Sequence, residues 1–218
     1  MNTVSIIGDS YLQPAVEMLD RILTSRRSRW RNQIRVNSFE CGHAASSCFL
    51  VMLCLDSYIV RLAYVNNETK NRRKKLNALE FFEHQYPDYH SIHKLREAFV
   101  LRDLLAHNHL WEIESSRNSS GDEIVARATL HPCFGDAKLH ASLNQSTRRT
   151  KHLHLHAIPT QVGREDAVKI HETVYQALRE MEKDDINVCQ ASNLRVHFRG
   201  KNREWHEVID MAKKIIKK

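Results

Sequence analysis

An arginine and a histidine separated by four residues stand inside an apolar, helix-forming stretch of this chain. Arg102 and His107 are the two residues, and Asp103 directly follows the arginine. Arginine keeps its charge at any physiological pH, whereas histidine exchanges a proton near neutrality. A fixed cation for a phosphate and a carrier for protons are the minimum set for cleaving RNA without a metal ion. The spacing therefore makes Arg102 and His107 candidate catalytic residues.

The two side chains do not share one face of a regular helix. Residues five apart differ in direction by about 140°, because each residue turns the helix by about 100°. We expect the long arginine side chain or a local helix distortion to close this gap. RNA cleavage by 2′-hydroxyl attack also needs a base and an acid, and one histidine cannot fill both roles at once. A two-fold homodimer would bring a second copy of the pair into the same cleft.

The segment Arg102-Asp103-Leu104-Leu105-Ala106-His107 resembles the signature of HEPN-domain proteins, in which an arginine and a polar residue precede a histidine. Members of that superfamily are dimerising all-helical bundles, and many are metal-independent endoribonucleases of toxin–antitoxin, phage-defence and CRISPR-associated systems. The resemblance implies that Arg102 contacts the scissile phosphate, His107 transfers protons and Asp103 orients the arginine or the RNA. It implies no cofactor. The implied partners are RNA, a second copy of the chain and an antitoxin or sensor protein. Some members carry a modifiable tyrosine two residues after the histidine, where this chain has His109.

Ordinary structural pairing gives a second interpretation of the same residues. Arg102 can form an ion pair with Asp103 or a nearby glutamate, and the chain is then a non-catalytic nucleic-acid or partner-binding helical module. Glu40 and His43 lie one helical turn apart on the preceding predicted helix and are further candidates to face the site. Such a pair is more often a surface hydrogen bond.

The charge balance favours a polyanionic partner. The chain of 218 residues has a formal net charge of +7, and its cations gather in two clusters before the motif. These clusters are candidate contacts to an RNA backbone, with a tryptophan placed to stack on a base. The predicted RNA-binding residues are Arg26, Arg27, Arg29, Trp30, Arg31, Arg72, Arg73 and Lys74.

A histidine-rich segment offers a competing chemistry. His152, His154 and His156 alternate with leucines, which in a strand would place all three imidazoles on one face. Three imidazoles are enough for a catalytic zinc site, with His131, Cys133 and His140 as possible additions. A His-rich metallohydrolase is therefore a third hypothesis. The alternatives are a polar strand face without metal, or one that touches RNA.

Composition and patterning predict a mainly α fold. With 42% hydrophobic and 27% charged residues, and only six glycines and four prolines, the chain is typical of a soluble globular protein with long helices. We predict a HEPN-like helical bundle that forms one domain over residues 1–218, with residues 115–160 as a small β-containing insertion after the motif helix. Predicted helices cover residues 11–23, 37–64, 70–86, 91–111, 164–183 and 203–218; predicted strands cover 123–130, 151–158 and 194–198; residues 115–122 are a predicted loop.

Apolar spacing also indicates which helix faces are buried. The contacts predicted for the first helix are Leu12, Ala15, Val16, Leu19, Ile22 and Leu23. Those for the second are Phe39, Ala45, Phe49, Met52, Leu53, Ile59, Val60 and Ala63. Those for the helix at 164–183 are Ala167, Val168, Ile170, Val174, Leu178 and Met181.

The sequence favours a cytoplasmic location. The odd number of five cysteines and the lack of a CxxC pair are typical of reduced thiols. Residues 1–10 show no secretory signal pattern. The longest apolar run, residues 48–55, is too short to span a bilayer, so we predict a buried helix there and no membrane partner.

Overall fold

The computed structural model describes residues 7–25, 38–66, 76–107, 111–117, 119, 123–130, 137–184 and 188–217, which are mainly helical. The elements are α1 (Gly8–Thr24), α2 (Ser38–Val65), α4 (Ala78–Gln85), α5 (Ile92–His107), β1 (Trp111–Arg117), β2 (Glu123–Leu130), α6 (Ala137–Ser142), β3 (Leu143–Asn144), β4 (Arg149–Thr150), the 3₁₀ turn η2 (Pro159–Gln161), α7 (Arg164–Asp184), the 3₁₀ turn η3 (Ala191–Asn193), β5 (Arg195–Phe198), β6 (Lys201–Glu204) and α8 (Trp205–Ile216).

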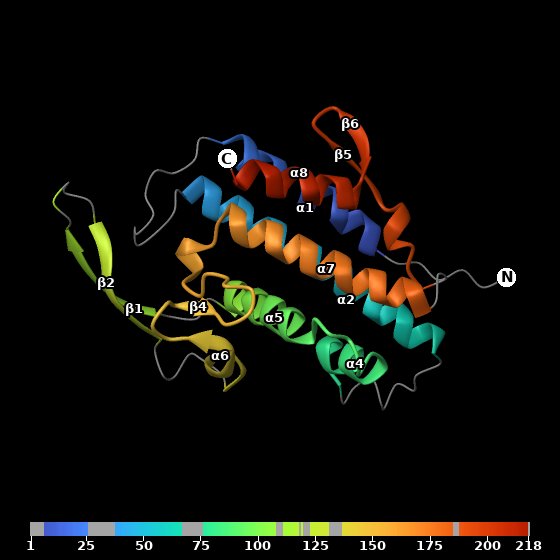
Figure 1. Ribbon diagram of the computed structural model, residues 1–218, viewed down its shortest axis with the longest axis horizontal. Coiled ribbons are helices and arrows are strands. Elements are labelled where there is room, and N and C mark those ends of the chain that lie inside the picture. Colours follow the sequence, from blue (N-terminus) through green and yellow to red (C-terminus); the bar gives the residue numbers. More distant parts are fainter. Residues whose placement is uncertain are drawn as a thin grey trace.

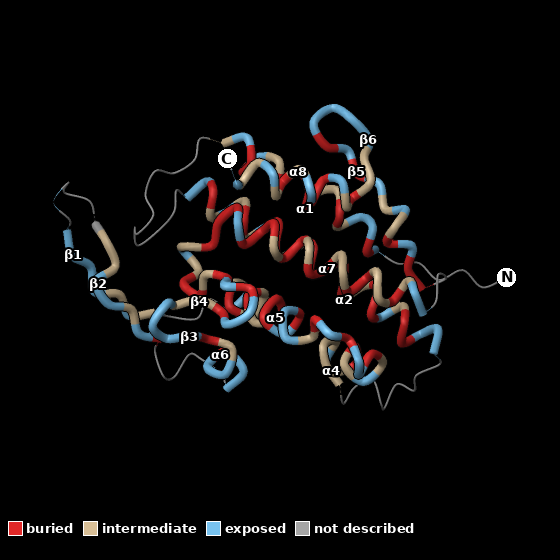
Figure 2. The backbone as a smooth tube through the Cα atoms, viewed as in Figure 1, coloured by how far each residue is buried: buried red, intermediate tan, exposed pale blue. Residues whose placement is uncertain are grey.

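Helices α2 and α7 lie in the middle of the helical body. On one side they are covered by α1 and α8, and on the other by α5 and α4 (Figure 1). The buried residues follow the facing sides of these helices, while the outward sides are exposed or half-buried (Figure 2). Apart from Ile158, the buried apolar side chains belong to one continuous cluster that includes residues of every long helix.

Helices α1 and α7 confirm the faces that their apolar spacing predicts. Every residue predicted to be inward on these two helices is buried. The small residues of α2 allow the close approach to α1 that an Ala/Ser-rich stretch favours. The Oγ of Ser47 donates a hydrogen bond of 2.8 Å to the carbonyl of Ala15, which joins the backbone of α1 to the side chain of α2.

The predicted face of α2 is partly wrong. Phe39 and Val60 are 45% and 42% exposed, and the buried positions include Ala44, Cys48 and Leu55 instead. An apolar residue stands on nearly every side of this helix, so periodicity alone does not select the face that packs against α1 and α7.

Helix α2 is long and apolar enough to cross a membrane, as judged by length and composition. The helix spans 28 residues because apolar residues continue past Asp56, and half of its most apolar 18-residue window is buried within this chain. Buried core helices of globular proteins have the same composition.

The strands form three separate two-stranded antiparallel sheets, β1–β2, β3–β4 and β5–β6. The predicted strand at 123–130 is β2, and the predicted strand at 194–198 is β5. The expected continuation of the motif helix to Trp111 is wrong, because α5 ends at His107 and Trp111 begins β1. Part of the predicted loop at 115–122 is also strand, because Ser115, Ser116 and Arg117 pair with β2 after a bulge. Helix α6 was not predicted.

Two further corrections concern strand ends. Residues 151–158 do not form a strand, and only His156 makes an isolated bridge, to Arg149. Gly200, which follows the predicted strand at 194–198, lies in the β5–β6 turn with a φ of 75°, which glycine adopts without strain. The chain then forms β6, so the last helix begins at Trp205 rather than near Arg203.

Candidate functional site

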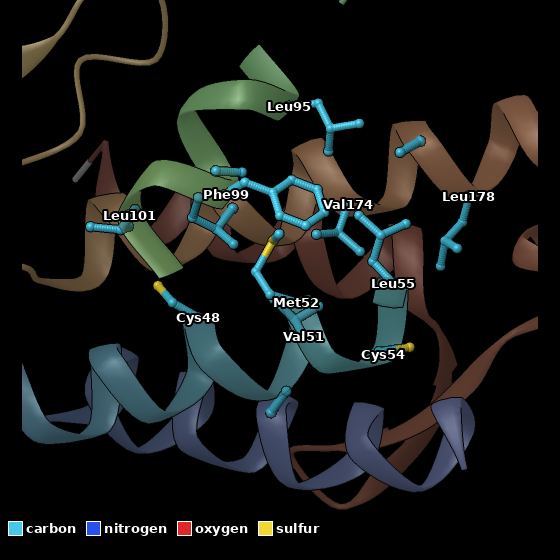
Figure 3. Packing of buried hydrophobic residues seen from close by; sticks show 14 of the residues in the cluster. Cys48, Val51, Met52, Cys54, Leu55, Leu95, Phe99, Leu101, Val174 and Leu178 are labelled. Carbon is cyan, nitrogen blue, oxygen red and sulfur yellow. The ribbon is translucent and has the colours of Figure 1, made fainter. Parts of the chain in front are cut away.

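Helix α5 carries the Arg102/His107 motif, and its apolar side anchors it in the core. Ser91 directly precedes the helix, and its carbonyl accepts the N–H of Leu95, as expected for the residue at a helix start. Phe99 lies close to Met52 of α2 and Val174 of α7 (Figure 3). These contacts fix the direction in which the more polar side of α5 faces.

Arg102 forms the centre of an ionic cluster between α5 and α2. Its Nη1 donates to Oδ2 of Asp56 at 2.7 Å, while its Nε and Nη2 donate to Oδ1 of Asp103 at 3.0 and 2.9 Å. The guanidinium also lies over the ring of Phe99, with its carbon 4.7 Å from the ring centroid. The Arg102 side chain is 24% exposed, so Asp56, Asp103 and Phe99 contact it while part of it remains accessible to solvent.

The electrostatics of this cluster are unequal for its two carboxylates. Burial raises the pKa of Asp56 above its usual range; Arg102 opposes that rise, and Asp103 adds to it. The second oxygen of Asp56, Oδ1, is buried and has no hydrogen-bond partner among the described residues. Asp103 is 43% exposed, against 25% for Asp56. Asp56 is thus the inner anchor of the arginine, and Asp103 is its solvent-facing partner.

The structure brings Arg102 and Asp103 together and places His107 apart from that ion pair. His107 is the last residue of α5, is exposed, and lies in the final turn. The helix continues to His107, so the motif lies at a helix end and not at a break in the middle of a helix.

A groove opens beside Arg102, with a volume of about 410 Å³. Its walls come from α4, α5 and α6, and its lining combines apolar side chains such as Leu79 and Leu139 with charged ones. Among the charged residues, Arg96 pairs with Glu83 at 2.6 Å. The lining residues are Asn77, Leu79, Glu80, Glu83, Arg96, Phe99, Val100, Arg102, Asp103, Lys138, Leu139, Ala141 and Ser142.

The histidine-rich segment is an irregular loop, so the predicted alignment of three imidazoles is wrong. His154 has a φ of 54°, which reverses the chain direction in the middle of the alternating pattern. His156 turns inward, where its Nδ1 lies 2.8 Å from Oδ2 of the buried Asp166. No group of three or more His, Cys, Asp or Glu side chains within the described ranges is arranged to hold a metal ion.

Two buried carboxylates hold this loop, and neither stood out in the sequence. Glu97 of α5 is 2% exposed; its two oxygens accept the backbone N–H groups of His152 and Leu153 at 2.8 and 2.7 Å. Asp166 of α7 accepts the N–H groups of His156 and Gly163 at 3.0 and 2.9 Å. Hydrogen bonds from these N–H groups and from His156 lower the pKa of Asp166, against the burial that raises it.

Several predicted site residues do not join Arg102. Glu40 is buried in an ion pair with Arg164 at 3.0 Å, and His43 hydrogen-bonds the carbonyl of Phe39, so neither faces the site. The predicted RNA-binding residues lie outside the described residues. They are Arg26, Arg27, Arg29, Trp30, Arg31, Arg72, Arg73 and Lys74.

Asp56 is the residue of the site that sequence reasoning missed. It stands 46 positions before Arg102, and its one signal was a carboxylate directly after the longest apolar run, residues 48–55. No protein-family model matches the chain, and neither does any curated protein or solved structure.

Proposed function

We propose that this protein is a metal-independent endoribonuclease of the HEPN type. It acts in the cytoplasm as a homodimer, as the effector of a toxin–antitoxin or phage-defence system. The observation that carries the proposal is the arrangement of Arg102, which is anchored from α2 and open to a groove, on the helix that ends in an exposed histidine. The resemblance of residues 102–107 to the HEPN signature supports the same reaction.

Arg102 stabilises the reacting phosphate in this proposal. The hydrogen bonds to Asp56 and Asp103 use three of its five N–H groups. The remaining N–H groups, on Nη1 and Nη2, are available to phosphate oxygens as these gain charge. Asp56 keeps the guanidinium plane fixed, and the more exposed Asp103 is the partner that an incoming phosphate displaces.

His107 moves the protons. The 2′-oxygen attacks phosphorus and loses its proton to a base, while the bond from phosphorus to the 5′-oxygen breaks and that oxygen gains a proton. The products are a 2′,3′-cyclic phosphate and a 5′-hydroxyl. A single imidazole does not serve as base and acid in the same step, so the proposal assigns the two roles to the His107 side chains of two subunits.

The test is cleavage of end-labelled RNA in the presence of EDTA. We expect the wild-type chain to produce cyclic-phosphate ends, and His107→Ala and Arg102→Ala to lose at least about 100-fold in rate, as removal of a proton-transfer or charge-stabilising group does. His206→Ala, on α8, is the matched control and keeps full activity. Full cleavage by both motif variants, with melting temperatures like the wild type, refutes the assignment.

One observation favours a second function, a non-catalytic nucleic-acid or partner-binding module. Two carboxylates surround the single guanidinium of Arg102, which is the structural pairing that the sequence also allowed. In this case RNA binding weakens steeply with salt and no cleavage occurs. Substitution of Arg102 then lowers thermal stability and changes no product.

A further inference from the structure

The loop that follows β3 gathers six basic side chains within nine residues. We call residues 148–156 the basic loop. The acidic residues nearest to it in the sequence are Asp136 and Glu165, so no carboxylate interrupts it. Its basic residues are Arg148, Arg149, Lys151, His152, His154 and His156.

The side chains of Arg149, Lys151 and Lys169 bond to backbone carbonyls and not to carboxylates, and Nη2 of Arg149 also donates to Nε2 of His156 at 2.7 Å. Nη1 of Arg149 donates to the carbonyl of His154 at 2.9 Å, and Nζ of Lys169 on α7 donates to the same carbonyl at 3.4 Å. A carbonyl orients a cation without neutralising it. Arg96, Arg102 and many other cations of the described chain have a carboxylate within 4 Å instead.

Lys151 follows the same rule, and Arg148 likewise has no carboxylate partner among the described residues. Nζ of Lys151 donates to the carbonyl of Ala141 at 2.6 Å, and Arg148 is half-buried in the turn that leads into β4. Within the described ranges, none of Arg148, Arg149, Lys151 and Lys169 lies within 4.0 Å of a carboxylate oxygen. Positive charge therefore accumulates at this surface.

The loop is rigid before any ligand arrives. Glu97 on α5 and Asp166 on α7 accept hydrogen bonds from its backbone N–H groups. The Oγ1 of Thr150 accepts the N–H of Leu155 at 3.0 Å. Cations on a preorganised backbone lose little conformational freedom on binding. The N–H groups stabilise these two buried carboxylates without cancelling their charge, and the four cations Arg148, Arg149, Lys151 and Lys169 outnumber them.

The basic loop continues the wall of the groove at Arg102. The backbone N–H of Lys151 donates to the carbonyl of Ser142 at 3.1 Å, and its Nζ donates to the carbonyl of Ala141. Ala141 and Ser142 both line the groove. Figure 1 shows β4 beside α5 and α6. On the other side of the loop, the ring of His152 stacks on His93 of α5, with centroids 5.1 Å apart.

We propose that the basic loop binds the phosphate backbone of single-stranded RNA next to the reacting phosphate and guides the strand into the groove. A chain of phosphates fits better than one small anion, because Lys151 and the Arg149/Lys169 pair hold different carbonyls and present charge at two separate places. The stacked imidazoles of His152 and His93 give an adjacent base a flat surface. The inference rests on the proposed function for its ligand, RNA, and for the place of the reacting phosphate at Arg102.

The test is binding and not cleavage. The full chain carrying His107→Ala is titrated into a fluorescent single-stranded RNA at several salt concentrations, and anisotropy gives the affinity. Each lost phosphate contact lowers the slope of log K against log salt by about 0.7 for single strands. Arg148→Gln with Lys151→Gln should therefore lower the slope by about 1.4, which corresponds to about 25-fold weaker binding at about 0.1 M salt.

Two further variants make the result decisive. Lys201→Gln with Lys214→Gln removes the same charge from β6 and α8, both exposed positions, and should change the affinity less than about twofold. Lys169→Gln leaves the loop itself intact and should lower the slope by about 0.7. It is informative even if the double loop variant does not fold.

The outcomes separate this inference from the proposed function. Equal RNA affinity of the loop variants and the Lys201/Lys214 control overturns the inference, even if the wild-type chain cleaves RNA. Loss of RNA affinity in the loop variants supports it, even if the wild-type chain cleaves nothing. Loop variants that bind vesicles of anionic lipid less tightly while their RNA affinity is unchanged also overturn it.

Discussion

Replacing Glu97 with alanine should be among the most destabilising single changes in this chain. The Glu97 carboxylate is buried and accepts two backbone N–H groups, at 2.8 and 2.7 Å. A hydrogen bond to a charged group contributes about 1.5–3 kcal/mol, so Glu97→Ala should cost about 3–6 kcal/mol. For a chain of this size, that loss lowers the melting temperature by roughly 6–24 °C. Glu97→Gln keeps one acceptor oxygen and should lose about half as much.

Thermal unfolding followed by far-ultraviolet circular dichroism measures this effect. Glu83→Ala is the matched control, because it removes a carboxylate from an exposed ion pair with Arg96. Such a pair contributes about 0.2–1 kcal/mol, so the control should melt within about 4 °C of the wild type. A Glu97→Ala chain that melts as high as Glu83→Ala would show that the buried carboxylate does not hold the basic loop, and the reasoning fails.

Two other predictions concern buried titratable groups. Burial lowers the pKa of His171 to about 3, so below pH 6.5 the unfolded chain binds a proton that the folded chain does not; the free energy of unfolding should fall as pH drops from 6.5 towards 3. Urea titrations should show a flatter pH dependence for His171→Gln, and an equally steep one contradicts the assignment. Burial raises the pKa values of Cys48, Cys54 and Cys189, that of Cys189 to about 12. Mass spectrometry should therefore find these thiols unalkylated by iodoacetamide in the native protein at neutral pH and alkylated in urea, and rapid native labelling would contradict their burial.

Sequence periodicity predicted the buried face of those helices that are apolar on one side only. Helices α1 and α7 each have one apolar and one polar face, so the spacing of their apolar residues identified inward residues that are all buried. Helix α2 is apolar on nearly all sides, and its buried face depends on α1 and α7, which local spacing does not contain. The strands and turns after His107 were predicted only in part, because their ends depend on pairing between segments.

Long-range partners explain what was missed around the motif. The sequence offered an ion pair of Arg102 with Asp103 or a nearby glutamate as the alternative to catalysis, and the structure has the pair with Asp103 at 2.9 Å. The hydrogen bond between Arg102 and Asp56 joins two different helices, so no local sequence pattern predicts it. The alternating histidines predicted a strand, but Glu97 and Asp166 compete for the backbone N–H groups that a strand would use.

The packing of Trp205 has a consequence for synthesis of the chain. Trp205 begins α8 and is fully buried; its Nε1 donates to Nδ1 of His171 at 3.2 Å, and β5 and α8 both contact α1. Helix α1 therefore remains partly uncovered on the ribosome until residues 195–216 have been translated. A truncated nascent chain keeps apolar surface exposed to chaperones and proteases, so a cell accumulates the finished fold only after this segment has been made.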